Sequence, residues 1–459
     1  MNQMKNSGLM IFLITLFSLS VFAVCDYEPT IETSGKVLKE LKIKKSRAGT
    51  ANEFAEIGLF IKASVKDASW EKKDAEAAVL TVFVDGKYNQ DAILFAGEKS
   101  FEYQMLLGKY NSSDEHQITI VLNKARSAPN VENVKIQSAF STFFEDLTIT
   151  KPPDRSIPAY LATLNAPLIY LRPNTIDKFS DIPLLTYYEI FDEPENIKKI
   201  RYTTIFTNED GGTQSAALMA RWGRMTDIEW IYEMRVSETG GILSQIYQGA
   251  NHETRNFQGK RFGSHPLIFD ATVNNNFADA GCSPLRVSPL LVQTDLSNGS
   301  RENVMDAFPW TYQIMAEEAI RENRINSKNL GANTIDNLQN YLYVEVYSEN
   351  DSAAVAVEVQ MTDGKTSRSD LGDARLRVDR SGYKRIAVRL PSPNSSLKSL
   401  SLICQPTSNA SNDSVCRNAR IVKFIRLDEN DQIFSTKNPS SETHSLKSGE
   451  NLSWSLTAR

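Results

Sequence analysis

The sequence predicts a mostly β protein in which two smaller β-sandwich-like domains flank a larger β-rich central domain that ends in one amphipathic helix. Short segments rich in β-branched and aromatic residues, which are typical of strands, recur along the chain. Polar turn sequences such as Asp85-Gly86 separate these segments. The chain has 459 residues, 41% of them hydrophobic and 23% charged, which is enough core material for several domains.

The chain starts with the features of a secretory signal. Lys5 precedes the apolar run Leu9–Val24, and Val21-Phe22-Ala23 fits cleavage after Ala23. The run is shorter than the roughly 20 residues that a membrane-spanning helix needs, so a cleaved signal is favoured over an anchor. We therefore expect residues 1–23 to be removed and the mature protein to be secreted, periplasmic or in the cell envelope. Cys25 follows the run directly, so a lipoprotein is the second interpretation, and membrane association is expected only if Cys25 is lipidated.

The four cysteines predict disulfides, because an even number in an exported chain usually forms a disulfide framework. Cys404 and Cys416 close a short loop within one β-rich region and are the favoured pair. Cys25 and Cys282 would then form the second pair, whereas lipidation of Cys25 would leave Cys282 free. No C-x-x-C spacing of a zinc site is present.

The order of patterns gives the expected domains. Strand–turn–strand patterns fill residues 24–150, and the proline-rich stretch 151–158 is typical of a linker. Five strand-like segments and then an amphipathic helix that begins near Pro309 indicate a central domain over residues 159–325. Alternating apolar residues then predict a second sandwich over residues 336–435, followed by a flexible polar tail over residues 436–459.

Net charge and composition restrict the function classes. The formal net charge is −5 and there is no strong basic patch, which argues against nucleic acid as a partner. Sandwich-like modules with abundant aromatic and amide side chains favour binding of an extracellular or cell-envelope polysaccharide. Two alternatives remain open: a glycan-active hydrolase or lyase, and a structural envelope protein without a small ligand.

One candidate site lies around the segment 221–230. If Asp227–Val236 is a strand, Asp227 and Glu229 point to the same face, and paired carboxylates are the catalytic groups of glycosidases. The alternative is a solvated ion network with nearby arginines. Exposed tryptophans could stack on sugar rings, although tryptophan more often packs in a core. The candidate ligand-binding residues of this segment are Arg221, Trp222, Arg224 and Trp230.

Two further segments suggest a metal or a catalytic base. Asn208, Glu209 and Asp210 precede two glycines, and oxygen ligands on a sharp turn suit Ca²⁺, which is the one cofactor that the sequence suggests. A plain β-turn is the alternative. His252 and Glu253 lie in a loop-like stretch and could ligate a metal, but their spacing matches no known metal template.

The stretch "RFGSHPLIFDATVNNNFADAGC", residues 261–282, provides the remaining candidates. Pro266–Val273 is expected to be a strand, with His265 and Asp270 as catalytic candidates beside it. A histidine that bonds a neighbouring strand is the alternative for His265. The run that follows can form a tight polar turn or a rim that presents amides to a ligand; it consists of Asn274, Asn275 and Asn276.

The central region, about residues 165–280, resembles a family of unknown function associated with vacuolar protein sorting. The resemblance lies in the order of "APLIYLRP", "TDIEWIYEMRV" and "HPLIFDATVNNNF". The family's Ser-His pair after the last strand is replaced here by Asn274–Asn276. The family has no settled activity, so the resemblance implies a fold for this region and no reaction.

Overall fold

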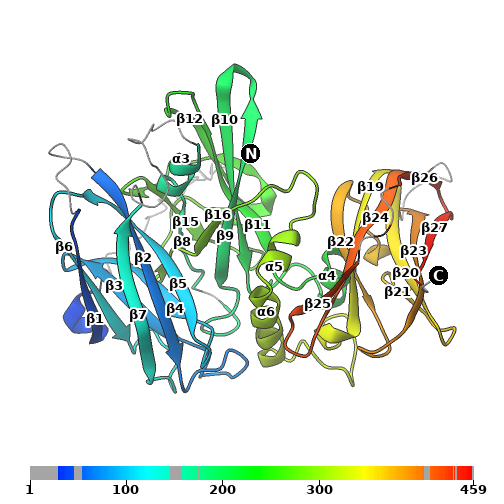
Figure 1. Cartoon of the computed structure of the whole chain (residues 1–459), viewed down its shortest axis with the longest axis horizontal. Coiled ribbons are helices and arrows are strands. Elements are labelled where there is room, and N and C mark those ends of the chain that lie inside the picture. The colour runs from blue at the N-terminus through cyan, green and yellow to red at the C-terminus, as the bar shows by residue number, and fades with distance from the viewer. Residues whose placement is uncertain are drawn as a thin grey trace, which may run out of the picture.

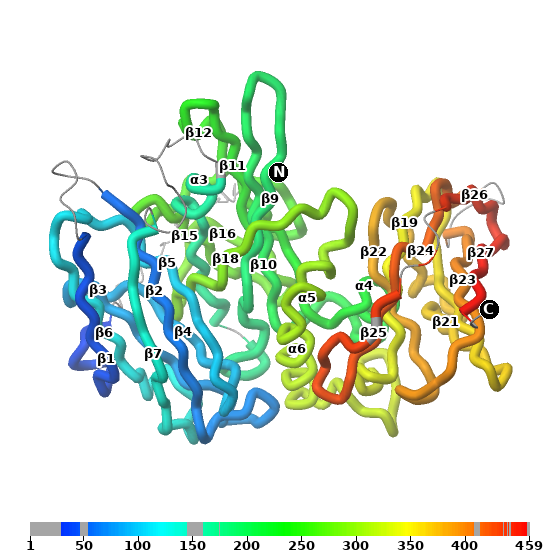
Figure 2. The backbone as a smooth tube through the Cα atoms, in the orientation of Figure 1, coloured from blue at the N-terminus to red at the C-terminus, as the bar shows by residue number. Residues whose placement is uncertain are grey.

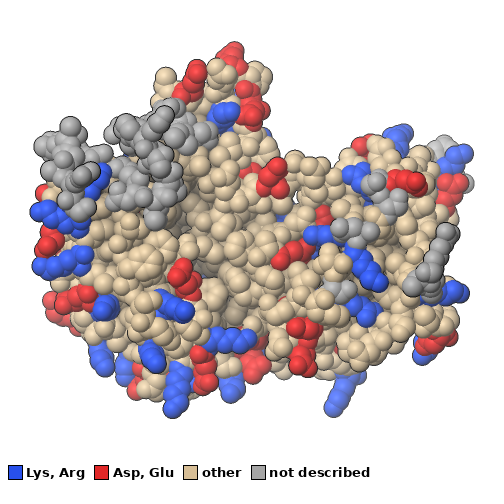
Figure 3. Space-filling view, viewed as in Figure 1, with Lys and Arg blue, Asp and Glu red and all other residues tan. Residues whose placement is uncertain are grey.

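The computed structural model describes residues 29–45, 54–144, 158–173, 175–407, 414–437, 439 and 442–456. The chain is mostly β, as predicted, with several sheets and few helices (Figure 1). No helix in this part of the chain is long and apolar enough to span a membrane. On the face shown in Figure 3, acidic and basic side chains are interspersed and do not gather by sign.

The N-terminal unit consists of a four-stranded and a three-stranded antiparallel sheet, which follow a short first helix, α1 (Ile31–Ser34). Apolar side chains of both sheets share one core, which is why these alternating and apolar segments form strands. The first sheet has the order β1 (Gly35–Ile43), β6 (His116–Asn123), β3 (Ala78–Val84), β4 (Lys87–Leu94). The second has the order β5 (Phe101–Asn111), β2 (Phe54–Val65), β7 (Val134–Phe143).

The central unit is built on a six-stranded sheet and a smaller mixed sheet. The large sheet has the order β13 (Thr254–Asn256), β12 (Ile242–Gln248), β11 (Ile228–Val236), β10 (Ile197–Phe206), β9 (Pro183–Glu193), β18 (Leu290–Gln293). The small sheet has the order β14 (Arg261–Phe262), β15 (His265–Asp270), β8 (Leu168–Tyr170), β17 (Arg286–Val287), with β16 (Phe277–Ala278) beside β15. The helices of this unit are α3 (Pro158–Leu164), α4 (Ser215–Trp222), α5 (Asn303–Ala307) and α6 (Trp310–Arg321).

The C-terminal unit again pairs two antiparallel sheets around one core. One has the order β22 (Gly382–Arg389), β19 (Tyr341–Asp351), β24 (Val415–Leu427), β25 (Ile433–Lys437), with β26 (His444–Lys447) also on β24. The other has the order β21 (Thr366–Arg368), β20 (Ala353–Met361), β23 (Leu397–Pro406), β27 (Asn451–Ser455).

Much of the expected polar tail continues this C-terminal unit. β26 pairs with β24, and β27 pairs with β23. The physical reason is a sparse alternation inside a serine-rich stretch: Leu446 is buried, and Leu452 and Trp454 pack against the same core.

The three units share hydrophobic cores. One hydrophobic cluster contains Ile57 of the N-terminal unit and Phe206 of the central unit, and another contains Ile228 of the central unit and Tyr343 of the C-terminal unit. Helix α6 lies between the two outer units (Figure 2). The segment 326–337, which joins the central unit to the C-terminal unit, is held by main-chain hydrogen bonds and buries Ile335. Residues 151–157 of the expected linker lie outside the described residues.

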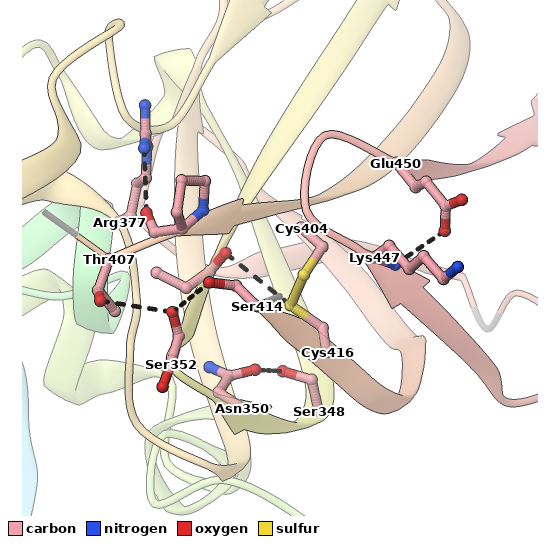
Figure 4. Close-up of a disulfide and its surroundings, with 12 residues drawn as sticks. Ser348, Asn350, Ser352, Arg377, Cys404, Thr407, Ser414, Cys416, Lys447 and Glu450 are labelled. Atoms are coloured by element: carbon pink, nitrogen blue, oxygen red, sulfur yellow. Dashed lines mark hydrogen bonds between the residues drawn. A yellow bond between two sulfur atoms is a disulfide. The ribbon is translucent and has the colours of Figure 1, made fainter. Parts of the chain in front are cut away.

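The predicted disulfide between Cys404 and Cys416 is confirmed; it joins β23 to β24 and is completely buried (Figure 4). Cys282 is also disulfide-bonded, and its predicted partner, Cys25, lies outside the described residues.

Replacing both Cys404 and Cys416 with serine should lower the free energy of unfolding by about 3 kcal/mol. The bond closes a loop with a sequence separation of 12, and opening it raises the chain entropy of the unfolded state. Urea denaturation of the double variant and the parent, both without reductant, measures the difference. A loss below about 1 kcal/mol would contradict a stabilising role for this bond.

Candidate functional site

Loops from both central sheets meet at one place, beside the end of β10 and the start of β11. The Asn208–Gly212 turn follows β10, Asp227 immediately precedes β11, and the Asn274–Asn276 turn follows β15. The main-chain N–H of Gly211 donates to the carbonyl of Val273, which fastens the first turn to the third. Segments that are distant in sequence therefore form one polar site.

The base of this site is a buried cluster that we call the acidic centre: Asp181, Asp210, Asp227 and Asp270 with Arg172 and Asn275. Arg172 Nη2 lies 3.1 Å from Asp181 Oδ2 and 2.6 Å from Asp210 Oδ2. Arg172 Nε lies 3.7 Å from Asp270 Oδ2, and the three carboxylate side chains are at most 2% exposed. One guanidinium group thus faces three buried carboxylates.

Asn275 joins the fourth carboxylate to this cluster. Its Nδ2 donates to Asp181 Oδ1 at 2.8 Å and to Asp227 Oδ2 at 3.1 Å. The backbone of Asn275 has a φ of 43°, in the left-handed region that asparagine tolerates better than most residues. The asparagine run therefore forms a turn whose middle amide is directed inward, between two carboxylates.

The crowding of carboxylates changes their protonation. Burial raises the pKa of Asp270 to about 8, against the opposing effect of Arg172. Burial and the neighbouring Glu229 raise the pKa of Asp227 to about 7. The pKa of Asp181 is raised well above its usual range by burial and by Asp270 and Asp210. The acidic centre consequently holds protons near neutral pH.

Beside the acidic centre lies a group that we call the polar rim: Glu229, Gln248, His252, Asn274 and Asn276. Gln248 and Asn276 are buried, and the other three reach the surface in part. Gln248 Nε2 donates to Glu229 Oε2 at 2.7 Å and lies 2.8 Å from His252 Nδ1. Asn276 Nδ2 is 3.2 Å from His252 Nδ1, and Asn274 Nδ2 is 3.2 Å from His252 Nε2. The His252 side chain is 52% exposed and that of Glu229 is 17% exposed, so the rim offers chiefly an imidazole, with part of a carboxylate and of the Asn274 amide, to solvent.

The backbone of the rim is held in uncommon conformations. His252 and its neighbour Asn251 belong to the 3₁₀ turn η2 (Ala250–His252) and have φ values of 60° and 57°. Together with Asn275 and with Asp181, whose φ is 57°, this places four non-glycine residues with positive φ at one site. Such backbones are uncommon and gather at functional sites, where the surrounding structure enforces them.

Gly212 makes the close approach between two of these turns. A Cβ atom at this position would lie 2.5 Å from Asn274 Oδ1 and 2.7 Å from Glu209 Oε1. We expect Gly212→Ala to lower the free energy of unfolding by about 1–3 kcal/mol more than a matched control, because the clash displaces Asn274 from His252.

The matched control for Gly212→Ala is Gly364→Ala. Both glycines have positive φ, but nothing lies within 4 Å of a Cβ at Gly364, so the difference between the variants isolates the clash from backbone strain. Chemical denaturation of both variants measures it. Equal losses would show that the two turns are not tightly packed here.

The structure brings together most of the candidates that were predicted separately. The acidic centre and polar rim contain Asp210, Asp227, Glu229, His252, Asp270, Asn274, Asn275 and Asn276, and Glu209 borders them through Gly212. The remaining candidates lie in other environments and have other partners.

His265 is a structural residue of the contact between units. It is completely buried, with Nε2 3.1 Å from Glu56 Oε2 of β2 and Nδ1 2.7 Å from the Ala166 carbonyl oxygen. This matches the alternative in which His265 bonds a neighbouring segment, and it separates His265 from Asp270 on the same strand.

The candidate arginines and tryptophans of the segment 221–230 have partners outside the acidic centre and the polar rim. Arg221 and Arg380 both lie over the Trp222 ring, at 4.7 and 5.1 Å from its centroid, so Trp222 faces the C-terminal unit. Trp230 has Arg201 over its ring at 5.4 Å. Arg224 forms a buried ion pair of 2.9 Å with Glu302.

The candidate metal ligands do not converge on one point. Asn208 Nδ2 donates to Glu322, Glu209 accepts from the Thr213 N–H, and Asp210 pairs with Arg172. Glu253 is exposed and pairs with Arg255. Among the described residues, no group of three or more His, Cys, Asp or Glu side chains is arranged to hold a metal ion.

Sequence reasoning missed Arg172 and Asp181. Arg172 follows β8 and Asp181 precedes β9, so both lie at the ends of short apolar segments, as charged residues commonly do. The sequence does place Arg172 next to last in the "APLIYLRP" segment, but only the structure shows that β8, within this segment, runs parallel to the strand that carries Asp270.

Compared with known protein families and with curated proteins, the chain matches none. Among solved structures, the C-terminal domain of EclA, a sugar-binding protein, is 14% identical with a TM-score of 0.17 and covers 24% of this chain and 69% of its own. The viral chemokine-binding protein R17 encoded by rodent gammaherpesvirus Peru is 9% identical with a TM-score of 0.13 and covers 82% of this chain and 84% of its own. Both TM-scores are too low to support a functional argument.

Proposed function

We propose that the chain is an exported saccharide-binding protein and that the polar rim binds a glycan of an extracellular or cell-envelope polysaccharide. The observation that carries this proposal is the convergence of the exposed His252 imidazole, the half-buried Asn274 amide and the partly buried Glu229 carboxylate above one buried polar base. Sugar hydroxyls both donate and accept hydrogen bonds, and Glu229, His252 and Asn274 offer matching acceptors and donors.

Two further features support this proposal. The buried Cys404–Cys416 bond fits an oxidising compartment, as expected for an exported chain. The strained backbone around His252 and Asn275 fixes the rim before a ligand arrives, and such preorganisation reduces the entropy lost on binding.

Glycan hydrolysis is a second candidate because of Asp227. Its pKa of about 7 lets this carboxyl group keep a proton near neutral pH, as a general acid requires. Glu229, whose side chain is 17% exposed, would then be the second carboxylate of the pair. Binding is the leading proposal because Asp227 contacts Asn275 and is 5% exposed.

A glycan array and polysaccharide pull-down with residues 24–459 tests the proposal. His252→Ala, Asn274→Ala and Glu229→Gln should each weaken binding about tenfold, because the first two remove a hydrogen-bonding side chain from the rim and the third replaces a charged acceptor with a neutral amide. Glu253→Gln is the matched control, since Glu253 is an exposed neighbour that pairs with Arg255 away from the rim.

Binding that is absent from every glycan, or unchanged in all three rim variants, would overturn the proposed function. The same screen with EDTA tests the calcium expectation; we expect binding to persist, because Asp210 is already paired with Arg172. Release of reducing ends from a bound glycan, lost in Glu229→Gln, would establish hydrolysis.

A further inference from the structure

A cavity of about 350 Å³ lies at the junction of the N-terminal and central units, separate from the polar rim. Small-molecule sites favour such junctions and combine apolar walls with a few polar groups. The apolar part of this wall is formed by Leu171, Pro173, Ile182, Pro284 and Leu285.

Arg126 lines the cavity from the turn after β6. The residue is 7% exposed, and its Nη1 lies 2.6 Å from Asp91 Oδ2. Its Nη2 is buried and has no hydrogen-bond partner within the described residues. A buried donor without a partner is destabilising, so this nitrogen is suited to an acceptor on a ligand.

Lys178 places a second positive charge next to Arg126. Its Nζ donates to the carbonyl oxygens of Ala125 and Ser127, at 3.0 and 2.6 Å, which are the residues on either side of Arg126. These acceptors are uncharged, so they orient the ammonium group without neutralising it. Both cations line the same cavity.

The far wall does not cancel this charge. Arg172 and Asp181 line the cavity from the acidic centre, where Arg172 Nη2 lies 3.1 Å from Asp181 Oδ2, so this pair adds no net negative charge to the wall. The wall therefore presents arginine and lysine side chains to a space whose other surfaces are largely apolar.

We propose that this cavity binds a small carboxylate with a six-membered ring, its carboxylate at Arg126 and Lys178 and its ring against the apolar wall. The volume is about twice that of an apolar cavity that holds one benzene molecule, which leaves room for a ring and a carboxylate. This site goes beyond the proposed saccharide function and does not depend on it.

Calorimetric titration of residues 24–459 with benzoate and cyclohexanecarboxylate tests the proposal. We expect saturable binding of at least one acid, and at least tenfold weaker binding of the neutral analogues benzyl alcohol and cyclohexanemethanol. Binding of neither acid, equal binding of the neutral analogues, or binding of inorganic phosphate in their place would overturn it.

Two variants at exposed positions locate the site. Lys178→Met should weaken carboxylate binding at least tenfold, and Ala125→Trp should abolish binding by filling the entrance. Lys135→Met on β7, which does not line the cavity, is the matched control and should bind as the parent does. Unchanged binding in both Lys178→Met and Ala125→Trp would place the ligand elsewhere and overturn the proposal. Neither variant touches the polar rim, so failure here leaves the saccharide proposal intact.

Discussion

Replacing Arg172 with methionine is expected to lower the free energy of unfolding at pH 7.5 by about 3–5 kcal/mol. Arg172 is the cation that faces Asp181, Asp210 and Asp270, and its side chain is 4% exposed. Without it, the buried carboxyl groups lose hydrogen-bond donors, and any of them that is ionised must take up a proton or stay buried without a charge partner. Urea denaturation monitored by tryptophan fluorescence measures the loss.

Two controls separate charge from packing at this position. Arg172→Lys keeps the charge but not the forked geometry, and we expect a smaller loss than for methionine. Arg375→Met removes a surface arginine, 87% exposed and paired with Asp373, and should leave the free energy of unfolding nearly unchanged. If Arg172→Met lowered the free energy of unfolding by no more than Arg375→Met does, the positive charge of Arg172 would not stabilise the acidic centre.

Local sequence patterns predicted the features that are determined by residues close together in the sequence. Alternating apolar residues indicated the strands, and the spacing of Cys404 and Cys416 indicated their bond. The two-residue spacing of Asp227 and Glu229 and the asparagine run were recognised as candidate groups because each is a short pattern with chemical meaning.

Contacts between distant segments could not be predicted in the same way. The partner of His265 is Glu56, which lies 209 residues earlier on another unit, and no local signal links the two. Arg172 and Asp270 meet only because β8 pairs with β15 in parallel. The site therefore depends on topology, which composition and periodicity did not specify.

The exposure of the tryptophans could not be predicted either, because it also depends on contacts between distant segments. A sequence shows that Trp222 ends a segment with helical spacing, but not that Arg380 of the C-terminal unit covers its ring. Exposure of an aromatic residue is decided by the packing of units against each other, and the shared cores of this protein bury surfaces that would be free on separate domains.

Raising the pH from 5 to 7 is expected to destabilise the folded protein by a few kcal/mol, which is unusual because most proteins gain stability from ionised carboxylates in this range. The folded-state pKa values of Asp227, Glu209 and Glu322 are about 7 and those of Asp270 and Glu318 about 8, all raised mainly by burial.

In the unfolded chain these groups titrate near pH 4, so between pH 5 and 7 the folded state binds more protons than the unfolded state. Stability is therefore fully present below about pH 4 for these groups and declines as the pH rises toward their folded pKa values. Each group that keeps its proton contributes about 1.4 kcal/mol per pH unit, so one or two such groups account for the expected loss of a few kcal/mol. Above pH 7 the buried Lys384, whose pKa is lowered to about 7 by burial, opposes the decline.

Denaturation at intervals between pH 5 and 7 tests this dependence, with Asp270→Asn as the decisive variant. The asparagine amide cannot ionise. The slope of the free energy of unfolding against pH should therefore become shallower than in the parent by the contribution of one proton, up to about 1.4 kcal/mol per pH unit. Asp373→Asn is the matched control: the pKa of Asp373 is lowered to about 2 by Arg375, so this carboxyl group is ionised throughout the range and its removal should leave the slope unchanged. A parent protein whose stability rises from pH 5 to 7 would show that the acidic centre is ionised in the folded state, and that the positive charge of Arg172 and the hydrogen bonds of Asn275 outweigh the effect of burial on its carboxylates.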